Sequence, residues 1–513
     1  MTTILSTPSG VATGPSTASV GCDVTVPLFF RNYVSGTLGA NATFARSSSA
    51  TIVDHEGVIR TVPSGAARFN GLRYVRNLIT LSSENLQVGW IARDGAVITG
   101  QDSVTFGAVN NSRLDRIFIL PAYSQKIIYR VDVKADDAGS VGKAFVLQAI
   151  SGATGGYSTL GSTSYTLTDT YSTIAISFTS HVSDFIVIPL LKCNELTTVK
   201  VNITNVQIEN VTGQTNQNPS EYVSVGVLSA PYHGANVDGV KYFTTENGNT
   251  VTDNVVTEGT GAAITGGYLL MEPAATNLAE WFSEINGTNY STNSNVVFAA
   301  NNAVAPDGTT AATRLTAAAT SSSGLYAADY VSGSSAVYTY SVFIKRGNCD
   351  WVTAGMFSGG VNYRAWFNLA SGVTGTQNNC TASIIYVGDG WYRVTVTTST
   401  AMAQELVSAP VPRDADGVVS TTGGYYCLAW GISIETGTTA TSPIPTSGTA
   451  VTRAAESLSY SGITADNETR AITDAGTVDT DDWDGIVDAT INGADNLAKI
   501  TSIDVYTTGE RPA

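Results

Sequence analysis

The sequence predicts an all-β protein. Charged residues make up only 13% of the 513 positions, whereas Gly occurs 50 times and Ser and Thr crowd every segment. This composition disfavours long amphipathic helices, which draw on Ala, Leu, Glu and Lys. It suits short strands joined by turns, because β-branched residues fit a pleated surface and Gly supplies turn conformations. With 43% hydrophobic residues, the chain is also too apolar to be wholly disordered.

Stretches with period-two alternation are the second observation. Six to eight alternating residues are the signature of a half-buried strand. Turn clusters such as VGDG, TTGG and ADDAGS stand next to these stretches. Four stretches alternate in this way, with the apolar face given in brackets: 127–134 (Ile127, Tyr129, Val131, Val133), 338–345 (Tyr338, Tyr340, Val342, Ile344), 391–398 (Tyr392, Val394, Val396) and 428–435 (Leu428, Trp430, Ile432, Ile434).

A repeat in the sequence is the third observation. The phrase RNL…SSEN at 76–85 returns as TNL…FSEIN at 276–286. Two further pairs follow in the same order, YRVDVK with YSVFIK and VQIEN with ISIET. The separation between the paired blocks grows from 200 to 211 to 226 residues, as loop insertions would produce. Units of this length are too long for a solenoid turn, so the repeat predicts two tandem domains of one fold.

These observations predict two tandem β-sandwich domains, each with two sheets packed as a jelly roll, since about eight short strands must each bury one face. The expected boundaries are 46–230 for the first sandwich and 231–457 for the second. Residues 1–45 are rich in Ser, Thr, Gly and Pro, which predicts an extended N-terminal arm that orders against a partner. Residues 458–513 are expected to form a small β tip or an interface segment.

Five blocks within 266–457 carry a family resemblance. In this order the blocks resemble a lectin-like jelly-roll module of tailed-phage fibre and head-spike proteins, and FARSSSATIVDHEGVIRTVPSGAARFNG at 44–71 resembles the segment that precedes such a module. The first unit departs from the pattern, because it has only DTYSTIAISF (169–178) where GDGWYR should fall. The blocks are LLMEPAATNLAEWFSEIN (269–286), APDGTTAATRL (305–315), VYTYSVFIKRG (337–347), GDGWYRVTVT (388–397) and GISIETGTTATSPIPTSGTAVTRAA (431–455).

The resemblance implies a structural protein on the virion surface and no known chemistry. It predicts a fibre or spike that docks onto other virion proteins through the N-terminal arm, forms a homo-oligomer, with a trimer favoured, and binds host-surface carbohydrate. A capsid decoration, cement or head-fibre protein that stabilises the shell is the alternative. A polysaccharide depolymerase is a third hypothesis, and a secreted bacterial carbohydrate-binding module is a fourth.

The sequence offers no persuasive catalytic constellation, so we predict that the protein is not an enzyme and needs no cofactor. His55, His181 and His233 each stand alone, are expected at the surface or in turns, and no GxSxG elbow accompanies them. Paired carboxylates for glycoside cleavage would be an arbitrary choice among 42 acidic residues.

Two sets of residues are candidates for binding. Trp351, Tyr363 and Trp366 lie in or near the Gly-rich stretch at 356–367, where loops could present them as sugar-stacking platforms; core packing is the alternative. Trp391, Tyr392 and Trp430 lie in alternating strands and are expected in the core.

The acidic run TVDTDDWDGIVD supplies Asp479, Asp481 and Asp484 as weak calcium candidates, but it fails the EF-hand spacing, so a solvated acidic turn is the alternative.

The net charge and the cysteine pattern limit which partners and which cellular compartment the sequence predicts. A net charge of −16 repels phosphate backbones, so nucleic acid is excluded as a partner. No stretch approaches 18 apolar residues, and the first 30 residues do not resemble a signal peptide, which predicts synthesis in a host cytoplasm and no membrane insertion. Five cysteines without a CxxC pair are expected to be free, buried thiols.

Overall fold

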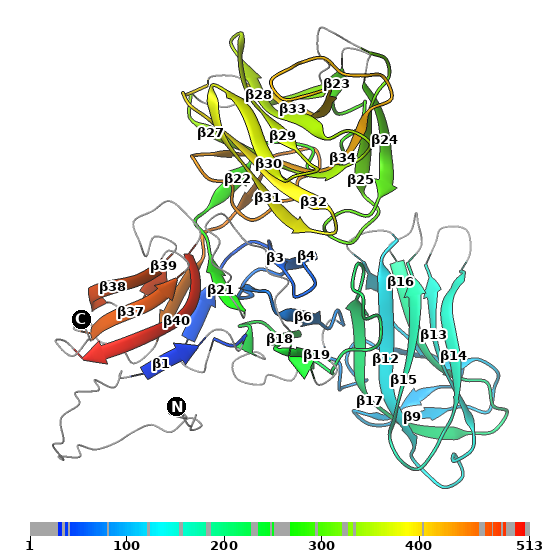
Figure 1. The fold of residues 1–513 in the computed structure, drawn as a ribbon. Coiled ribbons are helices and arrows are strands. Elements are labelled where there is room, and N and C mark those ends of the chain that lie inside the picture. Colours follow the sequence, from blue (N-terminus) through cyan, green and yellow to red (C-terminus); the bar gives the residue numbers. More distant parts are fainter. Residues whose placement is uncertain are drawn as a thin grey trace.

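A computed structural model of the chain shows an all-β protein, which confirms the predicted fold class (Figure 1). Every regular element in its described part is a β-strand. The structure describes residues 29–32, 36–38, 42–79, 82–120, 124–152, 157–180, 186–226, 234–246, 249–250, 267–292, 296–320, 327–331, 335–402, 405–460, 467–473, 476–483, 486–488 and 498–507.

The first sandwich contains two antiparallel sheets that enclose one core. One sheet has the order β14-β13-β16-β10-β7, with β11 also paired to β16, and the other has the order β15-β12-β17-β9-β8. Taking β9, β10 and β12–β17 as the eight strands, this is the jelly-roll order. The strands are β7 (Ile91–Arg93), β8 (Val97–Ile98), β9 (Ser103–Phe106), β10 (Ser112–Asp115), β11 (Phe118–Ile119), β12 (Lys126–Ala135), β13 (Ala144–Ser151), β14 (Thr159–Thr166), β15 (Ser172–Thr179), β16 (Ile186–Cys193) and β17 (Val199–Asn210).

The second sandwich repeats this topology. Its sheets have the orders β23-β26-β33-β28-β29-β30 and β24-β25-β34-β27-β32-β31. Its strands are β23 (Ser291–Thr292), β24 (Val296–Ala303), β25 (Ala312–Ala317), β26 (Ala327–Val331), β27 (Tyr338–Arg346), β28 (Trp351–Ser358), β29 (Val361–Asn368), β30 (Val373–Asn378), β31 (Cys380–Gly388), β32 (Trp391–Thr398), β33 (Glu405–Arg413) and β34 (Tyr426–Thr436).

Strands β30 and β31 distinguish the second sandwich from the first. They extend the two sheets at the same side of the sandwich, and the first sandwich passes from β14 to β15 without them. This insertion accounts for the growth of the repeat separation between its second and third blocks. It also explains why the first unit lacks GDGWYR, because that motif forms the turn between β31 and β32.

The predicted alternation is confirmed in three of the four stretches. The apolar faces of 127–134, 338–345 and 391–398 pack in or against the cores of their sandwiches. In β34 the prediction is wrong: Ile432 and Ile434 point into the sandwich, whereas Leu428 and Trp430 belong to a different cluster on the outer face. Gly431 has φ +73°, and the pairing of β27 with β34 shifts register here, so a bulge reverses the alternation.

A third body, here called the scaffold, lies between the sandwiches (Figure 1). Its core draws on residues from four distant stretches of the chain, at 38–74, 235–242, 269–271 and 458. Both sandwiches are therefore inserted into one discontinuous body. Its strands are β2 (Ala42–Ala45), β3 (Ala50–Val53), β4 (Ile59–Val62), β5 (Phe69–Asn70), β6 (Arg73–Arg76), β18 (Val240–Phe243), β21 (Tyr268–Met271), β36 (Ser457–Tyr460) and β39 (Ile486–Asp488), with the hairpin β19 (Thr245–Glu246) and β20 (Asn249–Thr250) next to β18.

The domain boundaries stay a prediction, but the cores place one segment differently from that prediction. Residues 46–76, expected in the first sandwich, lie in the scaffold, and the first-sandwich core begins at Ile79. The prediction assumed that each domain is one continuous segment. Of the expected arm, β1 (Phe29–Asn32) pairs with β40 (Ala498–Thr507), and residues 1–28 lie outside the described part. In the C-terminal region, β40 also pairs with β37 (Asn467–Thr473), which pairs with β38 (Gly476–Trp483).

A buried ion cluster joins three of the distant scaffold segments. Arg68 donates from Nε to Glu456 Oε1 at 2.6 Å and from Nη2 to Glu456 Oε2 at 2.5 Å. The same Nη2 reaches Glu272 Oε2 at 2.7 Å, Arg46 pairs with Glu456 at 2.7 Å, and Arg453 pairs with Glu272. Burial alone would raise the pKa of Glu272, but Arg68 and Arg453 outweigh it and hold that pKa at about 2. The ion pairs therefore fix the scaffold with charged groups that water does not reach.

The repeated sequence phrase has a structural role, which Asn77 shows in the first unit. Its side-chain amide donates to the carbonyls of Val206 and Val223, both at 2.9 Å. Its Oδ1 accepts from the backbone N–H groups of Ile79 and Ile208, both at 3.1 Å. One asparagine thus clamps the entry of the sandwich to its last strand and to the chain that leaves it.

Asn277 makes the equivalent four bonds in the second unit. It donates to Ile432 and Ile444 carbonyls at 3.3 and 2.9 Å and accepts from Ala279 and Ile434 N–H groups, both at 3.0 Å. β22 (Ala275–Asn277) pairs with β35 (Val451–Arg453) at the same place. The phrase recurs because each inserted sandwich needs the same closure at its neck.

The scaffold and both sandwiches meet at one junction. Gly213, just after β17, and Gly308, between β24 and β25, have positive φ angles of +76° and +80°. A Cβ on Gly213 would lie 2.5 Å from Gly308 Cα, so neither position has room for a side chain. Arg60 of β4 donates to the carbonyl of Thr212 and to Asp54 Oδ2.

Aromatic residues hold the scaffold against the sheet of the second sandwich that contains β27, β32 and β34. Ile59 of β4 packs in one cluster with Trp391, Trp430, Phe343 and Phe282. The Phe282 and Trp430 rings meet edge to face with centroids 4.8 Å apart. Trp391 and Trp430 are buried as predicted, although the core that they enter lies between domains.

Candidate functional site

The three predicted aromatic residues lie on two adjacent strands of one sheet. Trp351 begins β28, and Tyr363 and Trp366 lie on β29, which pairs with β28. Tyr363 points into the sandwich core and is 6% exposed. Trp366 has the opposite orientation, because it is an odd number of residues away in the same strand. The structure therefore brings the three residues into one sheet but not onto one surface.

The segment 414–421 covers Trp366 on the outer face of this sheet. Trp366 Nε1 donates to the Val418 carbonyl at 2.7 Å, and its side chain is 1% exposed. Asp416 of the same segment accepts from the Thr376 N–H at 2.7 Å. These positions correct the expectation that loops present the rings: a loop hides Trp366, Tyr363 is core, and Trp351 is the half-buried member of the three.

A different set of side chains occupies the open part of the same face. Phe357 on β28 lies opposite Asn362 on β29, and Arg364 lies between Gly355 on β28 and Asn378 on β30. Residues paired across strands share a face, so these four side chains point outward together. We call this set the outer face: Phe357, Asn362, Arg364 and Asn378.

The outer face offers unused hydrogen-bonding groups beside an exposed ring. Phe357 is 38% exposed, and Asn362, Arg364 and Asn378 are half-buried. Each amide side chain carries both donors and an acceptor. In the described part of the chain neither amide side chain makes an intramolecular hydrogen bond, and Arg364 Nε has no partner.

Trp366 contributes to this face from below. The Arg364 guanidinium lies over the Trp366 ring, 5.0 Å from its centroid, so the buried indole helps to orient the half-buried cation. Burial lowers the pKa of Arg364 from its ordinary value, although arginine stays protonated at neutral pH. The predicted residues lie on β28 and β29, the two strands that also carry Phe357, Asn362 and Arg364. The parity of β29 relative to Phe367, a clear core position, would have identified Arg364.

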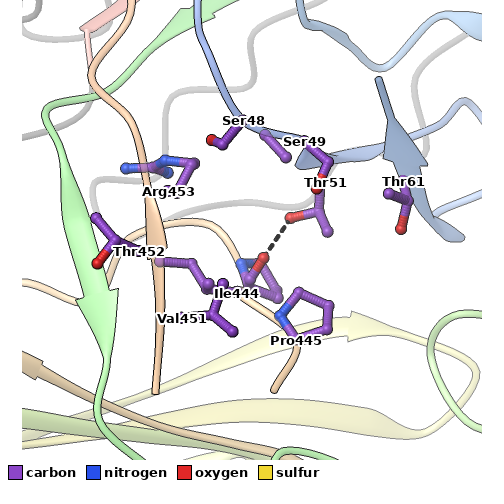
Figure 2. A pocket seen from close by; sticks show the side chains of 11 residues that line it. Ser48, Ser49, Thr51, Thr61, Ile444, Pro445, Val451, Thr452 and Arg453 are labelled. Carbon is purple, nitrogen blue, oxygen red and sulfur yellow. Dashed lines mark hydrogen bonds between the residues drawn. The ribbon is translucent and has the colours of Figure 1, made fainter. Parts of the chain in front are cut away.

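A pocket of about 170 Å³ lies where the scaffold meets the second sandwich (Figure 2). Its lining combines β3 and β4 with the segment that returns from β34: Ser48, Ser49, Ala50, Thr51, Thr61, Pro443, Ile444, Pro445, Val451, Thr452 and Arg453. Thr51 Oγ1 donates to the Pro443 carbonyl at 2.8 Å, and Arg453 is engaged by Glu272, Ser442 and the Pro273 carbonyl. Since these groups serve the domain contact, we interpret the pocket as a packing gap at that interface.

Two buried carboxyl groups with shifted pKa values occupy the necks of the sandwiches. Burial raises the pKa of Glu209 and of Glu435. Glu209 accepts from the Ser220 N–H at 2.8 Å, and Glu435 accepts from the Thr441 N–H at 3.0 Å. Both side chains are buried, so a substrate cannot reach them, and the shared arrangement indicates a structural role.

Among the described residues, no group of three His, Cys, Asp or Glu side chains is placed to hold a metal ion. The calcium candidates are outside this test. Asp479 and Asp481 lie in β38, whose side chains are not described, and Asp484 lies outside the described residues. They stay a prediction.

The one described histidine and the four described cysteines form no reactive cluster, and Cys22 lies outside the described residues. His55 lies in the turn between β3 and β4, as expected, but it is buried; His181 and His233 lie outside the described residues. Cys193, Cys349 and Cys427 are free and buried, and Cys380 is free and half-buried. Burial raises the pKa of Cys193 to about 12, which keeps its thiol protonated and unreactive.

Within the described residues, no helix has the length and apolarity needed to cross a membrane.

Comparison with known proteins gives structural likeness only. No family model matches the chain, and no curated protein matches it. A tandem CBM22-1–CBM22-2 domain of Paenibacillus barcinonensis Xyn10C covers 71% of this chain and 98% of its own, with 12% identity and a TM-score of 0.23. A family 16 carbohydrate binding module and a CBM61 module in complex with β-1,4-galactotriose each cover 26% of this chain and 97% of their own, with 14% and 13% identity and TM-scores of 0.20 and 0.18. At these values the likeness assigns neither a family nor a ligand.

Proposed function

We propose that this protein is a non-catalytic surface protein of a tailed phage particle, a fibre or spike that binds host-surface carbohydrate through its second jelly roll. The family resemblance of residues 44–71 and 266–457 supports the virion assignment. The outer face supports the binding assignment, and it is the single observation on which that assignment rests. Other virion proteins are the proposed partners of the N-terminal arm.

The outer face has the chemistry that sugar recognition needs. A pyranose ring presents an apolar face of C–H groups and a rim of hydroxyl groups. Phe357 can pack against the first, and the Asn362 and Asn378 amides can both donate to and accept from the second. Because the four side chains lie on paired strands of one sheet, little conformational entropy is lost on binding.

Weak binding by one face suffices if the particle carries many copies. A shallow sheet surface buries part of a sugar only, so single-site affinity is expected in the range of about 0.1–1 mM. A homotrimer, as the resemblance implies, raises the effective concentration of each further site and thereby the avidity. The close contacts at the junction of the three bodies are suited to holding such a face in one position.

Two experiments test the proposal. Immunogold labelling of purified particles locates the protein: label on the tail supports a host-binding fibre, label over the head indicates the decoration alternative, and particles without label overturn the virion assignment.

A glycan array tests binding with the wild type and the Phe357→Ala/Asn378→Ala double variant. We expect the variant to lose at least tenfold in signal. Soluble sugar products released from a bound polymer would instead identify a depolymerase.

A further inference from the structure

The first sandwich carries exposed aliphatic side chains on one of its sheets. Ile117 and Ile119 are 66% and 63% exposed, and Ile91 on β7 is 48% exposed. Phe118, between the first two, is buried in the sandwich core, so alternation along the strand directs both isoleucines outward. Two half-buried isoleucines of the same sheet complete a set that we call the aliphatic patch: Ile91, Ile117, Ile119, Ile150 and Ile188.

The register of the sheet brings these side chains together. Ile150 on β13 lies opposite Ile188 on β16. On the other side of β16, its antiparallel pairing with β11 includes Ile119 and Ile186, and the same register continued by two residues places Ile117 opposite Ile188. β-Branched side chains on neighbouring strands form a flat apolar surface. A contiguous exposed surface of this kind marks an interaction site on a soluble protein.

The duplicated fold shows that this surface is specific to the first sandwich. The hairpin of β13 and β14 corresponds to the hairpin of β28 and β29 in the second sandwich. Ile150 follows the core residue Ala149, as Phe357 follows the core residue Met356, so the two occupy equivalent outward positions. There the second sandwich presents amide and guanidinium groups beside Phe357, whereas the first presents isoleucines. An isoleucine side chain cannot hydrogen-bond to a sugar hydroxyl, so this surface suits an apolar protein partner.

The charges beside the patch favour a second copy of this chain as that partner. Arg93 forms an ion pair of 2.7 Å with Asp115, the residue opposite Ile91. Arg113 and Asp94 form a second ion pair close by, so the charges at this border of the patch neutralise each other. The net charge of −16 makes two copies of the chain repel each other in general. A neutral face lets them approach, and the patch of the second copy supplies the matching aliphatic surface.

We propose that copies of this chain associate through the aliphatic patch of the first sandwich, so that the patches of neighbouring copies pack together at a symmetry axis. Polar side chains of β14, which begin with Thr159 opposite Ile150, would form the rim of the contact. The inference goes beyond the proposed function and does not depend on it. It assigns the first sandwich to assembly and leaves the outer face of the second sandwich to the ligand.

The mass of the whole protein in solution tests the contact. Light scattering after size-exclusion chromatography is expected to give a whole-number multiple of the chain mass for the wild type at micromolar concentration. Ile117→Asp/Ile119→Asp places two carboxylates in the patch at exposed positions, which spares the fold of the single chain. We expect association of this variant to be at least tenfold weaker in sedimentation experiments, because like charges would face each other across the contact.

A charge-matched variant is the control. Leu196→Asp/Val297→Asp adds the same two charges at positions that are 76% and 53% exposed and lie outside the patch. This variant is expected to keep the mass of the wild type. Melting curves of both variants verify that each is folded, so a loss of association in the patch variant alone is assigned to the patch.

Three outcomes would overturn the inference. The first is a monomeric wild type, including one that associates only when purified phage particles are added, since the patch would then serve another virion protein. The second is an oligomer that Ile117→Asp/Ile119→Asp leaves intact, and the third is equal weakening by the control. Glycan binding by the dissociated patch variant is measured separately, so failure of the association and failure of the proposed function are distinguishable.

Discussion

Arg68 and Glu456 lie 388 positions apart in the sequence and share two hydrogen bonds of 2.6 and 2.5 Å, with both side chains completely buried. The pair joins the segment before the first sandwich to the segment after the second. Because the attraction between two charges is strong where water is absent, removal of one partner leaves the other desolvated and unpaired.

The first prediction concerns this pair. Arg68→Met should lower the free energy of unfolding of the scaffold by about 3–5 kcal/mol, since Glu456 and Glu272 would lose a buried cation. Urea denaturation followed by intrinsic fluorescence measures this loss. Arg346→Ala is the control, because Arg346 and Asp350 form an exposed pair, and its effect should stay within about 0.5 kcal/mol. Equal effects of the two changes would contradict the role given to the cluster.

The second prediction concerns pH. Glu272 has a folded pKa of about 2, below its ordinary value of 4.5, so its contribution to stability is present above about pH 4.5 and is lost as the pH falls towards 2. Burial raises the pKa of Glu435, so its contribution is fully present below the ordinary value of 4.5 and is lost as the pH rises through the folded pKa. The melting temperature should therefore rise on mild acidification from neutral pH and then fall below about pH 4.5.

Two glutamine substitutions assign the rise and the fall of the melting temperature with pH to individual residues. Glu435→Gln should flatten the rise between neutral pH and pH 4.5, and Glu272→Gln should flatten the fall below pH 4.5 while destabilising the protein at neutral pH. Calorimetric scans at half-unit pH intervals resolve both limbs. A fall that is unchanged in Glu272→Gln would show that other carboxylates cause acid unfolding.

The third prediction concerns the necks. Asn77→Ala should destabilise the first sandwich by about 2–4 kcal/mol, because it leaves two carbonyl and two N–H groups without their partners. Asn277→Ala should do the same to the second sandwich. Hydrogen exchange read by mass spectrometry reports each sandwich separately. Loss of protection in β34 on changing Asn77 would contradict independent closure of the two units.

The fourth prediction concerns the three-body junction. Gly213→Ala should separate the first sandwich from the second, since the added Cβ would lie 2.5 Å from Gly308 Cα. We expect a larger radius of gyration in small-angle scattering and faster proteolysis after β17. Gly142→Ala is the matched control: it has a similar φ of +82° but open space around it, so it should cost about 1 kcal/mol from backbone strain alone and leave the dimensions unchanged. Unchanged dimensions in both variants would show that this contact does not hold the domains together.

Local patterns predicted the strands well and the discontinuous body poorly. Alternation in 127–134 identified β12 and its buried face, because strand parity is a local property. The scaffold escaped prediction because its core joins residues such as Phe44, Leu269 and Leu458, whose proximity depends on the closure of two whole domains between them. The repeat was visible, but its meaning was not: Asn77 and Asn277 look like ordinary turn residues until their four bonds are known.

The candidate site also shows that local sequence patterns cannot predict contacts with distant segments. The sequence around 356–367 led us to expect aromatic rings at the surface, but Tyr363 and Trp366 are buried. It could not show that segment 414–421 lies over Trp366, because that cover comes from a distant loop. The prediction rested on aromatic rings, whereas the half-buried outward positions of β29 include Asn362 and Arg364.

The insertion of both jelly rolls into the scaffold has a consequence for synthesis. Each sandwich is continuous in the chain and can fold as it leaves the ribosome, but Arg68 must wait for Glu456. At about 5–20 residues per second this delay is roughly 20–80 s. A chain released before Glu456 is made could therefore contain folded sandwiches, but its scaffold would lack the Arg68–Glu456 pair. Synthesis past Glu456 therefore has to precede closure of the scaffold, and only then are the two jelly rolls held in their final positions.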